Sequence, residues 1–303
     1  MRRRPRDERL VTHLLVANAA AGSTEDEALE AAIAALEAAG PAADVELVRC
    51  QHPDDLEAAL DRLEGRVLVM AGGDGSLHLA VNLLHDRNEL AGVTLGLVPL
   101  GTGNDLARGV GIPLVPAEAG AALATGAPRR LDVLVDDDGG VVVNATHAGL
   151  GAEAADKAEG MKSALGPLAY PLGALVAGVR APGWQLRVVV DGTAVHDGPT
   201  LLVGVGNGPS IGGGTMLCPD AVLDDGQLDV VVATGVAPTE RMAFASALRK
   251  GAHTERDDVL VTRGTEVVVT GDPVRHDVDG ELTDELPTRT YTVLPGAWTL
   301  ITP

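Results

Sequence analysis

The chain has 303 residues, 46% of them hydrophobic, which is the composition of a folded globular protein with one or two domains. Its formal net charge is −20 and only 2% of its residues are aromatic, which argues against a nucleic-acid partner, since phosphates need a basic face and bases need stacking rings. The two cysteines, Cys50 and Cys218, have no metal-site spacing and favour a reduced cytoplasmic protein.

The first 130 residues alternate short β-branched runs with helical patterns. Strands are expected at 11–17, 45–49, 67–70 and 93–98, and helices at 24–39, 54–63 and 76–85. This alternation predicts a parallel sheet covered by helices, with ligands outside the carboxyl ends of the strands. Residues 1–6 are basic, but no apolar run follows them, so no signal peptide is predicted.

Two glycine-rich turns mark this part of the chain. Residues 72–75 (GGDG) and 101–104 (GTGN) each follow a strand and lead into a helical pattern. Glycine lets the backbone approach a ligand because no Cβ blocks the way, and the N–H groups at a helix start can bind an anion. Ser76 is expected to N-cap its helix or to donate its hydroxyl to a phosphate.

Asp74 lies inside the first turn. A carboxylate there would repel a bound phosphate unless a divalent cation lay between them, so a nucleotide site at this turn implies Mg²⁺. An ordinary tight loop closed by an Asx-type hydrogen bond is the alternative for one such turn alone. Two turns, one strand–helix unit apart, favour the phosphate site.

The segments GGDGS at 72–76 and PLGTGNDLAR at 99–108 resemble the signature of the diacylglycerol-kinase catalytic-domain family, which includes bacterial soluble lipid kinases and sphingosine kinases. Phosphofructokinases and NAD kinases share GGDG, whereas PLGTGND is far more specific. The resemblance implies ATP and Mg²⁺ as cofactors. The residues that it implies for the nucleotide are Gly72, Gly73, Asp74, Gly75, Ser76, Gly101, Thr102, Gly103 and Asn104.

The loop after the first strand has a weaker resemblance to the same family. The family motif is Asn-Pro-x-x-Gly and touches the nucleotide phosphates, and here Asn18 and Gly22 match it while the proline is missing. A plain connection between a strand and a helix is the alternative.

From about residue 131 the pattern changes to short alternating runs separated by Gly-Asp turns. Strands are expected at 131–136, 141–146, 184–190, 201–205, 228–232 and 267–270, with helical insertions near 152–179 and 238–250. This spacing predicts an antiparallel β-sandwich. A last strand at 291–294 and the tail after it match the family's return of the chain end to the first domain.

We therefore expect two domains. The first is an N-terminal three-layer α/β domain that binds ATP, at residues 1–130, completed by the tail at 291–303. The second is a C-terminal, mainly antiparallel β-sandwich domain that binds the lipid substrate, at residues 131–290.

One acidic motif of the second half reads DDGQLD at 224–229. It matches a family element whose aspartate binds Mg²⁺ together with backbone carbonyls in bacterial members. The resemblance implies that Asp225 and the carbonyls of Val222 and Gln227 hold an ion. A solvated Asp-Gly turn is the competing interpretation.

The other acidic motif, Asp279-Gly280-Glu281, resembles the C-terminal DGE of the family, in which a carboxylate accepts the proton of the lipid hydroxyl. The resemblance implies that Asp279 or Glu281 is this proton acceptor. Taken alone, VDGEL is a turn between two strands.

Together, the turns and the resemblance predict an ATP-dependent kinase that phosphorylates a hydroxyl of a diacylglycerol-like or long-chain-base lipid in the cleft between two domains. Its predicted catalytic residues are Asp74, Asp279 and Glu281. A kinase with a soluble substrate, of the NAD-kinase or phosphofructokinase type, and a non-catalytic nucleotide-binding regulator are the alternatives.

The expected partner is a lipid at the membrane surface, not a nucleic acid. The protein is expected to be cytoplasmic, in transient peripheral contact with the membrane, and the sequence leaves a homodimer open. The uncharged run at 164–177 is interrupted by Pro167 and Pro171, which favours either a buried helix or a movable lid over a lipid pocket.

Overall fold

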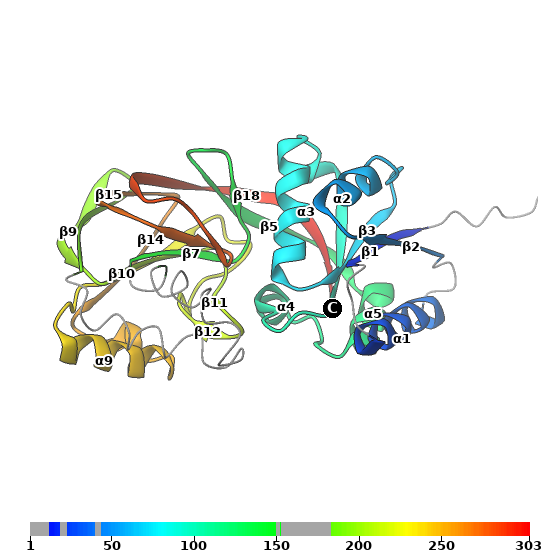
Figure 1. Cartoon of the computed structure of the whole chain (residues 1–303), viewed down its shortest axis with the longest axis horizontal. Coiled ribbons are helices and arrows are strands. Elements are labelled where there is room, and N and C mark those ends of the chain that lie inside the picture. The colour runs from blue at the N-terminus through cyan, green and yellow to red at the C-terminus, as the bar shows by residue number, and fades with distance from the viewer. Residues whose placement is uncertain (1–11, 19–22, 40–43, 150–151, 153–182) are drawn as a thin grey trace, which may run out of the picture. The chain divides into compact units, whose positions relative to one another are not determined.

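A computed structural model describes residues 12–18, 23–39, 44–149, 152 and 183–303 of the chain. The chain divides into two compact units, residues 1–130 with 298–303 and residues 131–297. Two long strands, β5 (Ala127–Asp136) and β18 (Leu286–Thr302), contribute residues to both units (Figure 1). The fold class is confirmed, with an α/β first unit and a mainly antiparallel second unit.

The N-terminal unit contains a parallel sheet in the order β2-β1-β3-β4. Its strands are β1 (His13–Asn18), β2 (Val45–Cys50), β3 (Val67–Gly72) and β4 (Thr94–Pro99). The last residues of β18 extend the sheet, because Thr299 and Leu300 pair in parallel with Thr94 and Leu95 of β4. The chain end therefore completes the sheet with which the chain begins.

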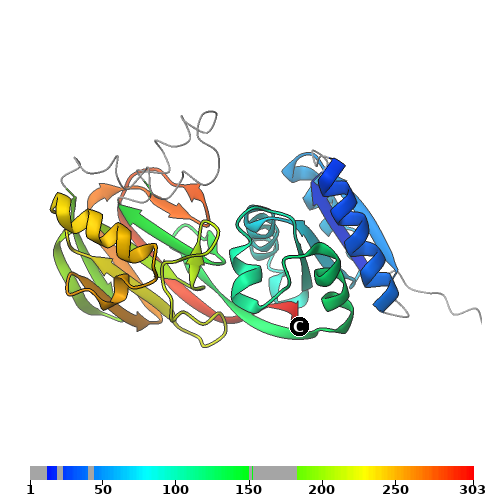
Figure 2. The ribbon, with the colours of Figure 1, turned by 90° about the horizontal axis from the view of Figure 1, so that it is seen from below.

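Helices cover both faces of this sheet, as Figures 1 and 2 show. They are α1 (Ser23–Ala39), α2 (Pro53–Leu60), α3 (Asp74–Asp86), α4 (Asp105–Val110) and α5 (Pro116–Thr125). One core under α1 and α5 is built from alanine, valine and leucine, for example Leu29, Val69 and Leu123. A Cβ on Gly120 of α5 would lie only 2.1 Å from the carbonyl oxygen of Ala32, so glycine permits the close contact between α1 and α5.

The C-terminal unit has two sheets around a common core. A six-stranded sheet has the order β14-β13-β10-β7-β16-β17, and the second contains β18-β15-β8-β9 with β5 and β6. Val203, Val230, Val269 and Tyr291 belong to the buried cluster between them. Helix α9 (Pro238–Leu248) contributes Phe244 to a second cluster with residues of β10 and β13.

The strands of this unit are short and mostly antiparallel to their neighbours. Besides β5 and β18 they are β6 (Val141–Val142), β7 (Ala145–Gly149), β8 (Trp184–Val190), β9 (Thr193–Thr200), β10 (Leu202–Gly206), β11 (Ser210–Ile211), β12 (Thr215–Met216), β13 (Leu228–Ala233), β14 (Val259–Gly264), β15 (Glu266–Val274), β16 (His276–Val278) and β17 (Glu281–Leu282).

Several predicted elements differ from those observed. The single strand expected at 141–146 is two strands, because the N–H groups of Val143, Asn144 and Ala145 donate to the carboxylate of Asp279. The sequence did not predict α5, β9 or β14. The insertion expected near 152–179 lies outside the described residues apart from Ala152, and the run at 164–177 lies outside them entirely.

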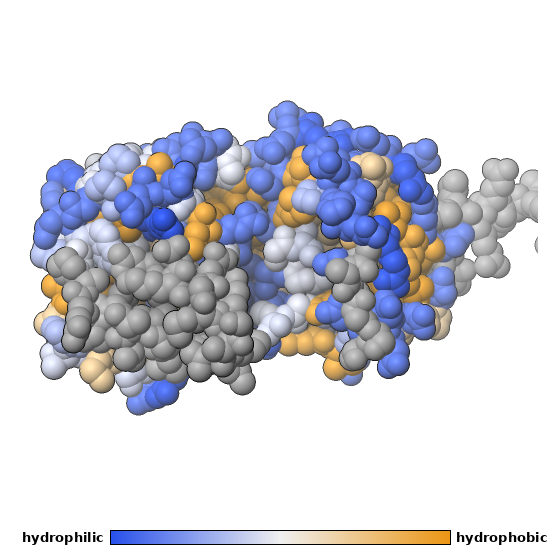
Figure 3. Space-filling model, in the orientation of Figure 1, coloured by the Kyte–Doolittle hydropathy of each residue, from blue (hydrophilic) through white to orange (hydrophobic). Residues whose placement is uncertain are grey.

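The described ranges contain no helix that is both long enough and apolar enough to cross a bilayer. Hydrophilic residues cover much of the face of the N-terminal unit seen in Figure 3, interrupted by smaller hydrophobic areas.

Candidate functional site

The two glycine turns leave the sheet side by side. Strand β3 ends at Gly72 and β4 ends at Pro99, and these two residues are opposite each other in the parallel pairing. The N–H group of Leu100 donates to the carbonyl oxygen of Gly72 at 2.9 Å. The topology of the sheet therefore brings together two motifs that are separated by a helix in the sequence.

The contact between the turns needs glycine at two positions. A Cβ on Gly101 would lie 2.4 Å from the Cα of Gly73, and one on Gly73 would lie 3.1 Å from the Cα of Gly101. Gly75 differs, because a Cβ there would meet no atom within 4 Å. Packing explains the first two glycines, whereas the missing side chain of Gly75 leaves the first turn of α3 open to a ligand.

The side chain of Asn104 closes the second turn on itself. Its Oδ1 accepts the N–H of Gly101 at 3.1 Å, and its Nδ2 donates to the carbonyl of Gly101 at 2.6 Å. Asn104 has φ 54°, a left-handed conformation that asparagine tolerates better than most residues. Its predicted contact with a nucleotide stays a prediction, and its observed use is to shape the turn, while Thr102 is exposed.

Asp74 connects the two turns. Its Oδ1 accepts the N–H of Leu106 at the start of α4, at 3.2 Å. Burial raises the pKa of Asp74, and the carboxylate of Asp105 raises it further, although backbone N–H groups oppose the change. The negative charge of Asp74 is therefore only partly stabilised by the protein, and a nearby cation would stabilise it further. One carboxylate fits Mg²⁺, which takes its remaining ligands from water and phosphate oxygens.

The prediction that Ser76 N-caps its helix is wrong. Strand β3 continues to Gly72 and α3 begins at Asp74, so Gly73 is the N-cap and Ser76 lies within the first helical turn. A Cβ on Gly72 would lie 2.7 Å from the Oγ of Ser76. Gly72 thus provides the space in which the Ser76 hydroxyl lies.

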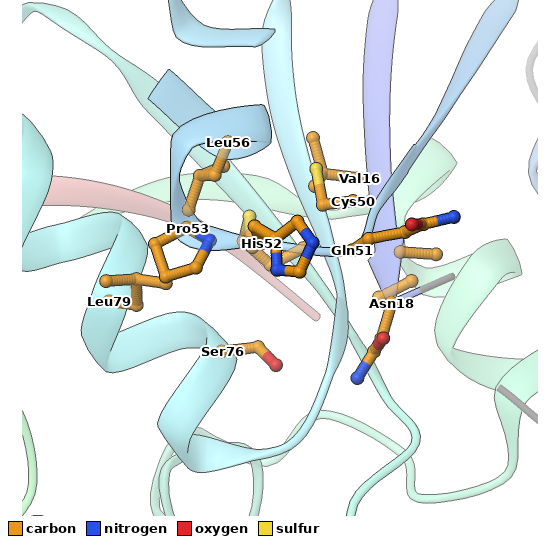
Figure 4. Close-up of a pocket in the computed structure, with 12 residues that line it drawn as sticks. Val16, Asn18, Cys50, Gln51, His52, Pro53, Leu56, Ser76 and Leu79 are labelled. Atoms are coloured by element: carbon orange, nitrogen blue, oxygen red, sulfur yellow. The ribbon is translucent and has the colours of Figure 1, made fainter. Parts of the chain in front are cut away.

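A cavity of about 170 Å³ lies beside the first glycine turn, where β1, β2 and β3 end (Figure 4). Polar groups of Asn18, His52 and Ser76 line it together with the apolar side chains of Leu56 and Leu79. Pockets for complete small ligands usually have about 300–1,000 Å³, so this one can hold only part of a ligand. Gly22, predicted for the same site, lies outside the described residues.

Several lining residues come from the end of β2 and the start of α2, and the sequence reasoning missed them. They are Cys50, Gln51, His52, Pro53 and Leu56. They form no motif. The predicted parallel sheet could have indicated them, because the pairing of β1 with β2 places Asn18 opposite Cys50 at the same edge of the sheet.

The two carboxylates of the DGE motif have different surroundings. Asp279 has φ 49°, and its carboxylate accepts the N–H groups of Val143, Asn144 and Ala145 at 2.6, 2.9 and 3.0 Å. Glu281 is exposed at the start of β17, and within the described residues its carboxylate makes no hydrogen bond or ion pair. Asp279 therefore anchors the turn, and Glu281 retains oxygens that can accept a proton.

A buried polar group lies close to this motif in the sheets. The hydroxyl of Tyr291 lies 2.9 Å from Nδ1 of His276 and 3.2 Å from Oγ1 of Thr146. Burial lowers the pKa of His276 to about 4, and the nearby Arg289 acts in the same direction. His276 is therefore neutral in the folded protein near pH 7.

The predicted metal ligand Asp225 already has a cationic partner. Its Oδ2 accepts a hydrogen bond from the guanidinium of Arg263, and its Oδ1 accepts the N–H of Gln227 at 3.0 Å. Arranged in this way, Asp225, Val222 and Gln227 do not fit a divalent ion, because the guanidinium lies where the carboxylate would bind it. Elsewhere in the described ranges, no group of three or more His, Cys, Asp or Glu residues is arranged to hold a metal.

Comparison with known proteins matches the two parts of the chain to two family models. Residues 12–135 match the diacylglycerol kinase catalytic domain, and residues 144–302 match the YegS C-terminal NAD kinase beta sandwich-like domain. A protein of Stenotrophomonas maltophilia (strain K279a), named "Probable lipid kinase YegS-like", is 36% identical over 203 residues, which are 65% of each chain.

Two further proteins are similar over more of the chain. The "Diacylglycerol kinase" of Mycobacterium tuberculosis (strain ATCC 25618 / H37Rv) is 32% identical over 255 residues, which are 82% of this chain and 80% of that protein. A crystal structure of a diacylglycerol kinase from Bacillus anthracis str. Sterne has a similar fold, with a TM-score of 0.74 and 24% identity over 97% of both chains. The chain therefore belongs to the family of diacylglycerol kinases and YegS-like lipid kinases.

Proposed function

We propose that this chain is an ATP-dependent lipid kinase that transfers the γ-phosphoryl group of ATP to a hydroxyl of a diacylglycerol-like or long-chain-base lipid. The observation that carries the proposal is the pair of glycine turns in close backbone contact, in which the half-buried carboxylate of Asp74 in the first turn accepts the N–H of Leu106 after the second. Phosphoryl transfer depends mainly on positioning and on charge stabilisation, and these turns supply both.

The nucleotide is placed by backbone groups and by the cavity. The first turn of α3 presents N–H groups and the positive end of a helix of 13 residues to the phosphates. Gly75 leaves room for this approach, and the Ser76 hydroxyl adds a donor. The adjoining cavity, which is lined by both apolar and polar side chains, then receives part of the nucleoside of ATP.

Asp74 is the proposed ligand for Mg²⁺ at this site. When bound, Mg²⁺ would neutralise the negative charge that builds up on the phosphate oxygens during transfer. Asp74 is the ligand from this chain, and the hydrogen bond from Leu106 fixes its orientation. Its raised pKa fits this role, because a nearby cation restores the charged form.

Glu281 is the proposed proton acceptor. The attacking lipid hydroxyl gives its proton to the Glu281 carboxylate as its oxygen forms the new bond to phosphorus and the bond to ADP breaks. Asp279 is a positioning residue, since its hydrogen bonds fix the turn on which Glu281 lies. The acceptor lipid resides in a bilayer, so the proposal includes transient contact of a cytoplasmic protein with a membrane surface.

The test is a transfer assay with ATP labelled at the γ-phosphate. Mixed micelles carry a diacylglycerol or a long-chain base, and NAD in solution represents the soluble alternative. We expect label in the organic extract with at least one lipid. Transfer to NAD alone, or ATP binding with no transfer to any acceptor, would overturn the proposal.

Asp74→Asn is the matched control for this assay. Asparagine keeps an oxygen that can accept the Leu106 N–H but removes the charge, so the melting temperature should be unchanged. Turnover should fall at least tenfold, which corresponds to about 1.4 kcal/mol of barrier. A smaller loss would contradict the role given to Asp74.

A further inference from the structure

The acidic turn at residues 222–229 lies between two strands of the C-terminal unit. Asp229 lies in β13 and pairs with Arg263 in the neighbouring antiparallel strand β14. Nε of Arg263 donates to the Oδ2 of Asp229 at 3.2 Å, while its Nη2 donates to the Oδ2 of Asp225. One guanidinium thus bridges the turn to the sheet.

The buried carboxylate of Asp229 needs a positive charge beside it. The side chain of Asp229 is only 3% exposed, and the carboxylates of Asp225 and Asp220 are its acidic neighbours. Arg263 is the cation in contact with it. Without it, a buried carboxylate would face two others with no positive charge beside it, an arrangement that destabilises a folded protein.

The rest of the turn is already held by internal hydrogen bonds. The carboxylate of Asp132 accepts the N–H groups of Gly226 at 2.7 Å and Gly296 at 2.6 Å. The N–H of Asp132 donates to the carbonyl of Leu223 at 2.7 Å. These hydrogen bonds within the chain hold the turn against the sheet.

We infer that Arg263 is a built-in cation for this turn and takes the place of the divalent ion that the sequence resemblance implies at Asp225. The planar guanidinium can bind two carboxylates at once, which a hydrated ion would otherwise do. The C-terminal unit is then stable without a divalent ion. The inference is independent of the proposed kinase activity, because it concerns folding stability alone.

The experiment measures thermal unfolding of the full-length protein without nucleotide, first freed of metal and then with millimolar MgCl₂ or CaCl₂, against KCl of equal ionic strength. The wild type and Asp225→Ala should respond equally to either ion. Arg263→Ala should melt lower without metal and gain at least about 2 °C when a divalent ion is added, because binding to the folded state alone raises its stability.

The double variant Arg263→Ala/Asp225→Ala is the control, and in it the gain should disappear. A divalent shift in the wild type that Asp225→Ala abolishes would overturn the inference, as would an Arg263→Ala variant with no gain. Should Arg263→Ala fail to fold without metal, refolding with Mg²⁺ or Ca²⁺ decides the question, since rescue supports the inference and its failure overturns it.

Discussion

The glycine turns of the N-terminal unit and the acidic turns of the C-terminal unit both carry motifs of the same family but use them differently. At the glycine turns, Gly73 and Gly101 pack against each other and leave Gly75 open toward a ligand. At the acidic turns, Asp225 and Asp279 are occupied by other groups of the same chain. An Asp-Gly motif can thus serve a ligand or the fold, and only the partners of the carboxylate distinguish the two.

The strongest test of this difference between ligand-binding and structural carboxylates is to remove the charge from each carboxylate of the DGE motif. Glu281→Gln should lower turnover by about 100-fold or more, the usual contribution of a general base, with an unchanged melting temperature. Asp279→Asn should instead lower stability by roughly 1–3 kcal/mol, because at least one of three buried N–H groups loses its acceptor.

Turnover and thermal unfolding of the same two preparations separate these effects. A Glu281→Gln variant that keeps wild-type turnover would show that this carboxylate does not accept the proton. A stable but inactive Asp279→Asn variant would reverse the roles of the two residues.

A smaller effect should separate two glycines of the first site. Gly101→Ala places a Cβ 2.4 Å from the Cα of Gly73, so the turns must move apart, at a cost of about 1–3 kcal/mol. Gly75→Ala should keep or slightly raise stability, since alanine favours a helix, while ATP binding weakens. Calorimetric titration with ATP measures the second effect, and an unchanged affinity in Gly75→Ala would mean that the phosphates bind elsewhere.

The last effect is the loss of stability at acidic pH. The pKa of His276 falls from 6.5 to about 4 in the folded protein, so the unfolded chain binds a proton in this range that the folded chain does not. Stability from this group should therefore decrease as the pH falls from about 6.5 to 4. The raised pKa of Asp74 acts in the opposite direction, because there the folded chain binds its proton first.

His276→Gln tests this contribution. The melting temperature of the variant should depend less on pH than that of the wild type between pH 6.5 and 4, and the two curves should run parallel above pH 7. Curves that stay parallel through the acid range would assign the loss of stability to other groups, such as His147, whose pKa burial also lowers.

The sequence predicted the glycine turns because their requirements are local. A strand, three glycines and a helix start lie within a few residues, and the parallel pairing of consecutive strands places two such turns together. The partners of the acidic residues are remote. The N–H groups bound by Asp279 lie up to 136 residues away, and Arg263 lies 38 residues after Asp225, on a strand that the sequence did not predict. Strand register, which periodicity alone does not determine, brings these groups together.

The pairing of β18 with β4 has a consequence for synthesis of the protein. Thr299 and Leu300 pair with the edge of the four parallel strands β2-β1-β3-β4, which have all been translated by residue 99. Until residues 299 and 300 have been synthesised, the β4 edge of these strands lacks this partner, and the whole second unit, which ends at residue 297, is synthesised before them. Folding from the N-terminus onward therefore cannot complete the first unit before the chain of the second unit has been synthesised.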